Sequence, residues 1–224
     1  MKTKNKVVLL ALCMVALIAV SVLGTMAYLT STDTVTNTFT VGQVKIKLDE
    51  AKVGADGKAL TGADAARVKA NSYKLMPGHE YDKDPTVTVL AKSEESYVRM
   101  LVTATFDKEL KDEKFATDLD EIFTGYNAAW KQVNKIVAVE EKTNADSTTS
   151  KYTVITYEYR YNTTVSAETA DTKLPALFTG IKIPDNWTND DLAALGGIKI
   201  EIVAEAIQAD GFKDANAAWA AFKN

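Results

Sequence analysis

The sequence predicts a mainly β protein, an antiparallel β-sandwich with a few helical insertions and a C-terminal helix. Apolar and polar residues alternate along several short segments, as in strands that bury one face. Polar stretches separate these segments, and this spacing is typical of an antiparallel sandwich. Of the 224 residues, 46% are hydrophobic and 25% are charged, so the chain can bury a single core without disulfides or metals.

The expected strands follow one another from residue 35 onward. Between residues 35 and 41 apolar side chains alternate with threonines, and between residues 44 and 48 they alternate with lysines. The other expected strands, rich in β-branched and aromatic residues, are residues 86–90, 97–106, 136–139, 152–161 and 198–207. In the strand over residues 152–161, one face carries Ile155, Tyr157, Tyr159 and Tyr161, and the other carries Thr156, Glu158 and Arg160.

Three helices are expected between the strands. Residues 111–132 place Phe115, Leu119, Ile122 and Phe123 at helical spacing, with Asp118 as N-cap. A short helix begins at residues 189–191 and ends at Gly196-Gly197, and a C-terminal helix covers residues 214–222. Loops are expected at residues 54–71 and 140–150. Neither is long enough to be a linker, so one domain is the simplest organisation.

The N-terminus has the pattern of a secretory signal. Three lysines precede an uncharged stretch over residues 7–32, and the small-x-small triplet Thr25-Met26-Ala27 follows its apolar core. We expect cleavage after Ala27, with Tyr28 as the new N-terminus and the mature domain over residues 28–224. The alternative is an uncleaved anchor, because the apolar run is close to the length that spans a bilayer.

Composition excludes several classes of function. The net charge of −4 provides no basic patch for nucleic acid. A zincin needs two histidines one helical turn apart, whereas the only histidine, His79, follows Pro77-Gly78 in an expected exposed turn. The only cysteine, Cys13, would leave with the leader. We assign no catalytic residue, no metal ligand and no cofactor.

Three sets of residues have two interpretations each. Paired carboxylates could bind calcium, but none has the spacing of a known calcium loop, which favours solvated turns. Tyrosines on one strand face could stack on carbohydrate, although a buried face is favoured, and the tryptophans are expected to anchor the core. The paired carboxylates are Asp82 with Asp84, Asp56 beside Gly57, and Asp190 with Asp191. The tyrosines are Tyr157, Tyr159 and Tyr161, and the tryptophans are Trp130, Trp187 and Trp219.

Several motifs resemble one family of exported proteins. They are Ala27-Tyr28-Leu29-Thr30, Asn37-Thr38-Phe39, Val41-Gly42, Leu48-Asp49-Glu50, Leu75-Met76-Pro77-Gly78, Lys83-Asp84-Pro85-Thr86-Val87, Tyr97-Val98-Arg99 and residues 204–209. The chain is similar to proteins processed by the SipW-type signal peptidase, which include the TasA-like biofilm matrix fibre proteins and the camelysins of Gram-positive bacteria. The leader block is the most specific part, and residues 108–170 match only loosely.

The resemblance implies a secreted fibre subunit with a jelly-roll-like sandwich. Subunits of such fibres join by donated N-terminal strands, which indicates residues 28–50 as the donor segment. Its assembly residues would be Tyr28, Leu29, Val35, Phe39 and Val41. The implied partners are a SipW-type signal peptidase and further copies of the chain, with or without an accessory matrix protein. The membrane would be contacted only through the uncleaved leader.

Three alternatives stay open at this point. The N-terminal strand could fold back into its own sheet instead of a neighbour's. The protein could also be a camelysin-type surface metalloprotease, or a monomeric surface adhesin that binds through its tyrosine face or a loop.

Overall fold

The computed structural model describes Cys13 and residues 42–110, 121–194 and 198–222. The chain divides into two units, Met1–Val41 and Gly42–Asn224, and Cys13 is the only residue described in the first. The predicted leader, its cleavage site at Thr25, Ala27 and Tyr28, the strand over residues 35–41 and all five assembly residues lie outside the described residues. So do Asp118 and Gly196-Gly197.

One large antiparallel sheet forms the first layer of the second unit. Its order is β12 (Ile198–Gln208), β5 (Ser93–Phe106), β8 (Thr149–Tyr161) and β7 (Trp130–Thr143), and β9 (Val165–Ala167) pairs with the start of β5. The ladders run nearly the full length of the strands, from Ile198 opposite Phe106 to Gln208 opposite Ser96. Within the described residues, β12 and β7 are therefore the two edges of this sheet.

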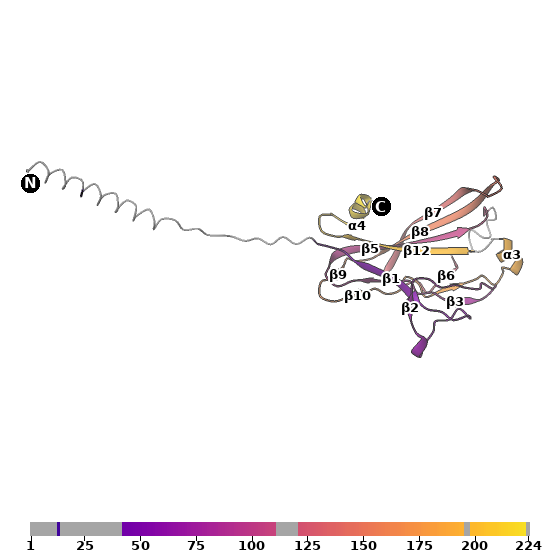
Figure 1. Cartoon of the computed structure of the whole chain (residues 1–224), viewed down its shortest axis with the longest axis horizontal. Coiled ribbons are helices and arrows are strands. Elements are labelled where there is room, and N and C mark those ends of the chain that lie inside the picture. The colour runs from indigo at the N-terminus through magenta and orange to yellow at the C-terminus, as the bar shows by residue number, and fades with distance from the viewer. Residues whose placement is uncertain (1–12, 14–41, 111–120, 195–197, 223–224) are drawn as a thin grey trace, which may run out of the picture. The chain divides into compact units, whose positions relative to one another are not determined.

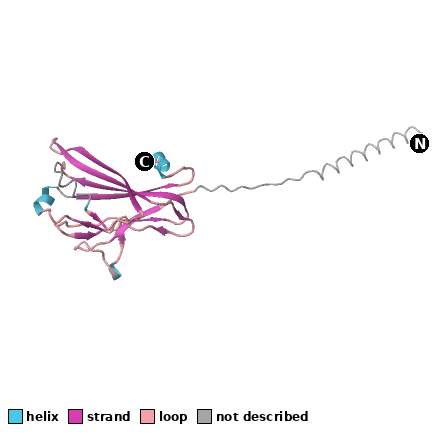
Figure 2. Ribbon diagram, turned by 180° about the vertical axis from the view of Figure 1, so that it is seen from behind, coloured by secondary structure: helices cyan, strands magenta, loops and turns pink. Residues whose placement is uncertain are grey.

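Two smaller antiparallel sheets form the second layer (Figure 2). One has the order β10 (Thr172–Lys173), β4 (Thr86–Val89), β1 (Ile46–Ala51) and β2 (Arg67–Val68). The other has the order β3 (Glu80–Asp82), β11 (Gly180–Lys182) and β6 (Phe123–Thr124). The described helical segments are η1 (Gly62–Asp64), α3 (Asn189–Ala194) and α4 (Ala215–Ala221).

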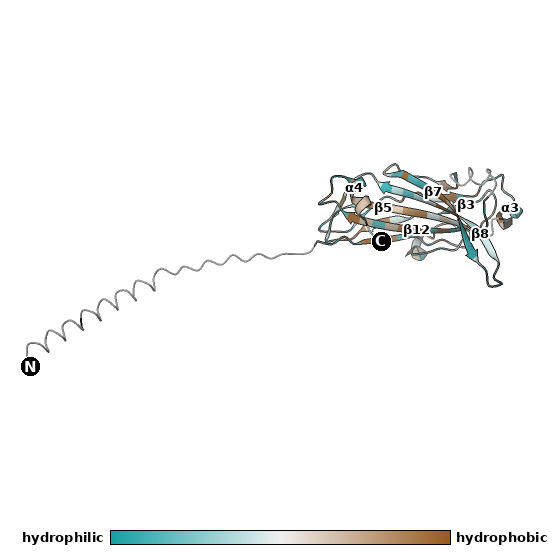
Figure 3. Ribbon diagram, turned by 90° about the horizontal axis from the view of Figure 1, so that it is seen from above, coloured by the Kyte–Doolittle hydropathy of each residue, from teal (hydrophilic) through white to brown (hydrophobic). Residues whose placement is uncertain are grey.

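A single hydrophobic core lies between the layers. Along β5 every second residue from Val98 to Phe106 is buried, and Val87 and Val89 of β4 face the same core from the other layer. In Figure 3 the long strands alternate between hydrophobic and hydrophilic segments. Burial of one face on each strand is what holds the two layers together. The prediction of an antiparallel β-sandwich is confirmed.

The expected strands are found within a few residues of their predicted bounds for β1, β4, β5, β8 and β12. Tyr157 and Tyr159 are buried in the core, so the face predicted for β8 is confirmed. α3 begins at Asn189 as expected. The C-terminal helix is found as α4, where the Asp214 carboxylate caps the first turn by accepting a hydrogen bond from the Ala217 amide at 2.9 Å.

The helix expected over residues 111–132 is wrong in its described second half. Phe123–Thr124 is the strand β6, and β7 begins at Trp130. Gly125 lies between them with φ of 69°, and a Cβ there would lie 2.1 Å from Thr179 Oγ1. The chain therefore turns tightly at this glycine. Phe123 and Trp130 are core residues of two different strands. They are seven positions apart in the sequence, which is also the spacing of two helical turns.

The loop expected over residues 140–150 is also wrong, because β7 and β8 continue through most of it as a long hairpin. Glu140 pairs with Tyr152 and Thr143 with Thr149, which leaves only a short turn at residues 144–148. The segment over residues 54–71 contains η1 and β2, although it is otherwise irregular. Of the helices in the described ranges, none is long and apolar enough to cross a membrane.

Candidate functional site

The sandwich is open along one side, where β1 and β12 run next to each other. In the described part of the chain, β12 pairs only with β5. β1 pairs with β4 along one edge, and its other edge meets β2 only at Glu50 and Ala51. β1 lies close to β12, but no ladder joins them. Two strand edges thus border the same opening. Among the described residues the outer edge of β12 has no strand partner and can accept a further strand. The edge of β1 is partly occupied, because Lys69 Nζ donates to the Leu48 carbonyl at 2.6 Å and the last two residues pair with β2.

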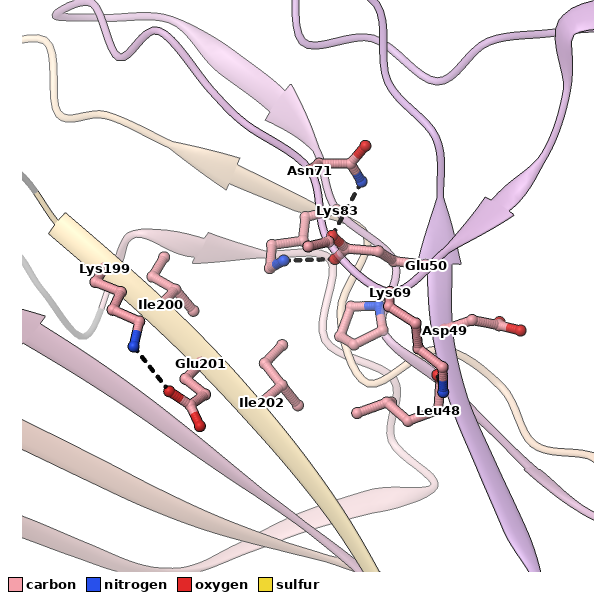
Figure 4. A pocket seen from close by; sticks show the side chains of 12 residues that line it. Leu48, Asp49, Glu50, Lys69, Asn71, Lys83, Lys199, Ile200, Glu201 and Ile202 are labelled. Carbon is pink, nitrogen blue, oxygen red and sulfur yellow. Dashed lines mark hydrogen bonds and ion pairs between the residues drawn. The ribbon is translucent and has the colours of Figure 1, made fainter.

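The wall of this opening on the β12 side is apolar. Ile198, Ile200 and Ile202 face the core side of the sheet but are only partly buried, whereas their neighbours on β5 are at most 4% exposed. Two adjoining depressions of about 260 and 270 Å³ run along these isoleucines. Figure 4 shows Ile202 and Leu48 on opposite sides of the first depression. We call this opening the β1–β12 groove.

A buried ion pair lies where the two depressions of the β1–β12 groove meet, since Lys83 and Asn71 line both of them. Lys83 Nζ lies 2.5 Å from Glu50 Oε2, and the two side chains are only 9% and 8% exposed. Asn71 Nδ2 donates to the other carboxylate oxygen of Glu50 at 3.0 Å (Figure 4). A buried charge is tolerated only when it is paired and hydrogen-bonded, and both conditions hold here. The pair fastens the end of β1 to the segment that leads into β4.

A second ion cluster holds β1 to β2. Arg67 Nε donates to Asp49 Oδ1 at 2.8 Å, and its guanidinium also bonds the Asp84 carboxylate. Lys47 Nζ lies 2.7 Å from Asp49 Oδ2. Burial alone would raise the pKa of Asp49, but the hydrogen bonds from Lys47 and Arg67 outweigh it and hold the pKa below its usual range. Burial lowers the pKa of Arg67, but the carboxylates of Asp49 and Asp84 raise it by more, so the pKa is above its usual value.

The second depression continues the apolar wall toward Tyr73. Its lining includes Leu75, Ile122, Ile181 and Ile183 besides the isoleucines of β12. The Tyr73 hydroxyl donates to the Asp82 carbonyl at 3.0 Å. Burial, followed by the Glu50 charge, raises the pKa of Tyr73, so this phenol stays neutral and acts as a fixed donor. The groove thus has an apolar wall along β12 and a polar cluster, which includes Lys83 and Asn71, where its two depressions meet.

Replacing Asp49 with asparagine should make the stability of the protein less dependent on acid pH. Because the folded-state pKa of Asp49 is lowered, its ion pairs stabilise the fold above about pH 4, the unfolded-state value, and are lost as pH falls through the folded-state value. The variant should lose about 1.5 kcal/mol of unfolding free energy at neutral pH. Urea unfolding at pH 7 and pH 3 measures the difference. An equal deficit at both pH values would contradict the assignment.

The β1–β12 groove is suited to bind an extended chain. A peptide laid along β12 would gain main-chain hydrogen bonds from the open strand edge and would place alternate side chains against Ile198, Ile200 and Ile202. The carboxylates that line the groove are engaged in ion pairs, Asp49 with Arg67 and Glu50 with Lys83. The arrangement is therefore that of a binding surface for a strand.

Comparisons with protein-family models, with curated proteins and with solved structures found no match for this chain.

The other residues singled out from the sequence lie apart from the groove or in structural roles. His79 is exposed, with Nδ1 3.1 Å from the Pro77 carbonyl, so its expected turn position is confirmed. Among the described residues, no group of three or more His, Cys, Asp or Glu side chains is arranged to hold a metal. The paired carboxylates bond to nearby backbone or cations, as Asp82 does with the Ala59 amide at 2.9 Å.

The tyrosine and tryptophan interpretations are decided by burial. Tyr157 and Tyr159 are 3% and 4% exposed, which leaves no platform for a sugar; the carbohydrate interpretation of this face is wrong. Trp130, Trp187 and Trp219 are all buried, but only Trp130 and Trp187 belong to the core between the layers, as expected for core anchors. Trp130 belongs to a strand, however, and not to the expected helix. Trp219 of α4 packs on the outer face of the large sheet, 4.3 Å from the Arg99 guanidinium carbon.

Sequence analysis did not identify the β1–β12 groove. It placed residues 198–207 on a strand, but alternation does not show whether a strand is central or at an edge. One local signal was present: Lys199 and Glu201 alternate with the isoleucines, and charged residues are common on edge strands. The partners across the groove come from β1 and from the chain before β4, more than 100 residues away in sequence.

Proposed function

We propose that this protein is a secreted structural subunit of extracellular matrix fibres, in which the N-terminal segment of one copy inserts as a strand into the β1–β12 groove of the next. The observation that carries the proposal is the open side of the sandwich, where the edge of β12, which has no second strand partner among the described residues, borders an apolar wall. A subunit with an acceptor groove and a separate donor strand joins head to tail. Because such a contact does not close on itself, it grows into a filament.

The sequence of the donor segment suits this groove. In an extended chain Val35, Phe39 and Val41 point to one side, since alternate residues share a face. Threonines occupy most of the other side, and Asp33 is the only charge between residues 28 and 41. The apolar side complements the isoleucines of β12, and the threonine side can face solvent. Asp33 lies on the same side as Val35, so the part of the donor that can meet the apolar wall without a charge begins at residue 35.

Processing of the leader would control assembly. While residues 1–27 are attached, the donor segment is tethered to the membrane and its end is not free. Cleavage between Ala27 and Tyr28 by a SipW-type signal peptidase would release it. The membrane would then be contacted only through the uncleaved leader. The fibres would start either from the subunit alone or with the help of an accessory matrix protein.

The two rival functions predict different behaviour. A camelysin-type protease predicts chelator-sensitive casein cleavage by the pure protein, which requires metal ligands that the chain does not offer as a zincin motif. A monomeric adhesin predicts a soluble protein that binds a glycan or host protein and forms no filaments. The burial of Tyr157 and Tyr159 removes the tyrosine face as a contact surface for that adhesin.

Truncation of the donor segment tests the proposal. A chain that begins at Tyr28 should form filaments visible by negative-stain microscopy, and a chain that begins at Phe39 should stay unassembled at the same concentration. N-terminal sequencing of the exported protein should find Tyr28. Equal rates of fibre formation by the two chains would overturn strand donation, and a membrane-bound product that begins at Met1 would overturn secretion.

A further inference from the structure

We infer that the edge strand β7 is a second assembly surface, which pairs with β7 of another copy in an antiparallel manner around a two-fold axis. The observation behind this is the concentration of exposed apolar side chains on β7. Of the described residues, seven large hydrophobic side chains are classed as exposed, and four of them lie on this strand. They are Val133, Ile136, Val137 and Val139, with exposures of 42%, 55%, 59% and 49%.

Val137 and Val139 are exposed because the second layer of the sandwich stops short of β7, whereas Ile136, opposite Thr156, lies on the outward face of the sheet. Val137 pairs with Ile155 of β8, and Val139 pairs with Thr153. These two β8 residues face the same side as their partners and are each only 2% exposed. The core is thus covered up to β8 and uncovered at β7. In Figure 1 the β7–β8 hairpin extends beyond the small sheets of the second layer.

The free edge of β7 is only partly protected against pairing. Soluble proteins guard such edges with charged residues, prolines and bulges. β7 has a register shift between Gln132 and Asn134 and charges at both ends, but residues 136–139 are uncharged, apolar and without proline. The hydrogen-bonding groups along this central stretch, on the side away from β8, have no strand partner among the described residues. The unprotected length is enough for a short ladder.

The charge pattern of β7 selects a second copy of β7 as the occupant. When a two-fold axis relates two antiparallel β7 strands, the inward face of one copy continues into the inward face of the other. Directly opposed residues then share a face, and because faces alternate along a strand their residue numbers must differ by an even number. Centred on Ala138, the pairing puts Val137 opposite Val139 and Lys135 opposite Glu141, each twice and all on the inward face. Lys135 Nζ lies 5.5 Å from the Tyr157 ring centre, which places it on this face.

Neighbouring registers lack this complementarity. Centring on Val137 sets Lys135 against Val139, and centring on Val139 sets Val137 against Glu141. Only the Ala138-centred register matches valine with valine and lysine with glutamate, and opposite charges across strands are stabilising where like charges are not. The two large sheets would then form one continuous sheet through two subunits, which removes both free β7 edges. Val137 and Val139 would cover each other on the inward face, and Ile136 would lie opposite Glu140 on the outward face.

This surface is independent of the β1–β12 groove. β7 and β12 are opposite edges of the same sheet, so occupation of one leaves the other accessible. A pair of short strands binds weakly by itself. If the subunits form fibres, as proposed above, the same weak contact would repeat along two filaments. The summed avidity of these contacts would hold the two filaments side by side.

Charge reversal on the mature chain tests the pairing. Lys135→Glu and Glu141→Lys should each weaken self-association of freshly prepared subunits by at least about tenfold, since each sets like charges opposite one another twice. Sedimentation velocity measures the fraction at twice the subunit mass. An equimolar mixture of the two variants should dimerise again, because one carries only glutamates and the other only lysines at these positions. The double variant should dimerise like the unmodified chain.

The outcomes separate this inference from strand donation. An unmodified chain that stays monomeric before fibres appear overturns β7 pairing, and so does a mixture that fails to recover. Single fibres that form without lateral pairs, for the unmodified chain, leave strand donation intact and overturn the inference. Dimers that follow the charge pattern while no fibre forms support β7 pairing and count against the proposed function.

Discussion

Replacing Ile200 with lysine should abolish fibre formation while the domain stays folded. Ile200 borders both depressions of the β1–β12 groove and is only partly buried. A lysine there would present a charge where the donor strand places an apolar side chain, which costs on the order of 2 kcal/mol and weakens binding more than tenfold. The long lysine side chain can reach solvent from an edge strand, so the domain itself should lose no more than about 1 kcal/mol. Microscopy and urea unfolding measure the two effects.

Val203→Lys provides a matched control on the same strand. Val203 is an exposed valine on the outward face of β12, so the substitution adds the same charge without entering the groove. This variant should form fibres at the rate of the unmodified chain. If both variants assembled equally well, or if Val203→Lys blocked assembly and Ile200→Lys did not, the β1–β12 groove would not be the acceptor.

Replacing Lys83 with methionine should destabilise the protein by about 3 kcal/mol, because it leaves the Glu50 carboxylate buried without its cation. Asn71 would then be the only side chain that donates to that carboxylate among the contacts described for it. Adding Glu50→Gln to the variant should restore at least half of the loss, since a neutral amide can still accept from Asn71. Chemical unfolding of the single and double variants gives both free energies.

An exposed ion pair on β12 provides the comparison for Lys83. Lys199 Nζ lies 3.1 Å from Glu201 Oε2, but the two side chains are 75% and 59% exposed. Lys199→Met should therefore change the unfolding free energy by less than about 0.5 kcal/mol. A similar loss for Lys83→Met and Lys199→Met would show that the Glu50–Lys83 pair does not stabilise the position of β1 beside the groove.

Much of the fold follows from local sequence patterns. Alternation placed β1, β4, β5, β8 and β12 correctly because each buries one face against a common core. The short strands β3, β6 and β11 were missed. They are two or three residues long, which is too short to show a period. They exist because a three-stranded sheet forms from segments that are far apart in the chain, as Gly180 does with Asp82 on one side and Thr124 on the other.

The errors on β7 have a related cause. The neighbouring strand β8 buries one face in the core, whereas β7 is mostly exposed on both faces. The sequence of β7 therefore shows weak alternation and many charges. Residues 140–143 look like a loop by composition, yet the ladder with residues 149–152 imposes a strand on them. The β1–β12 groove and the exposed edge of β7 both exist because β12 and β7 are edge strands. Which strands lie at an edge is set by strand pairing in three dimensions. The alternation of a single strand does not encode it.

Photo-cross-linking from the donor strand tests strand donation most directly. p-Benzoylphenylalanine would replace Phe39 in fibres assembled from an equal mixture of unlabelled and nitrogen-15-labelled chains, and mass spectrometry would locate the cross-links. We expect links from position 39 to residues 198–202 of β12 or 46–49 of β1, in pairs that combine both isotopes, because donor and groove belong to different copies. Links confined to chains of one isotope, or to surfaces away from the β1–β12 groove, would contradict assembly by strand donation.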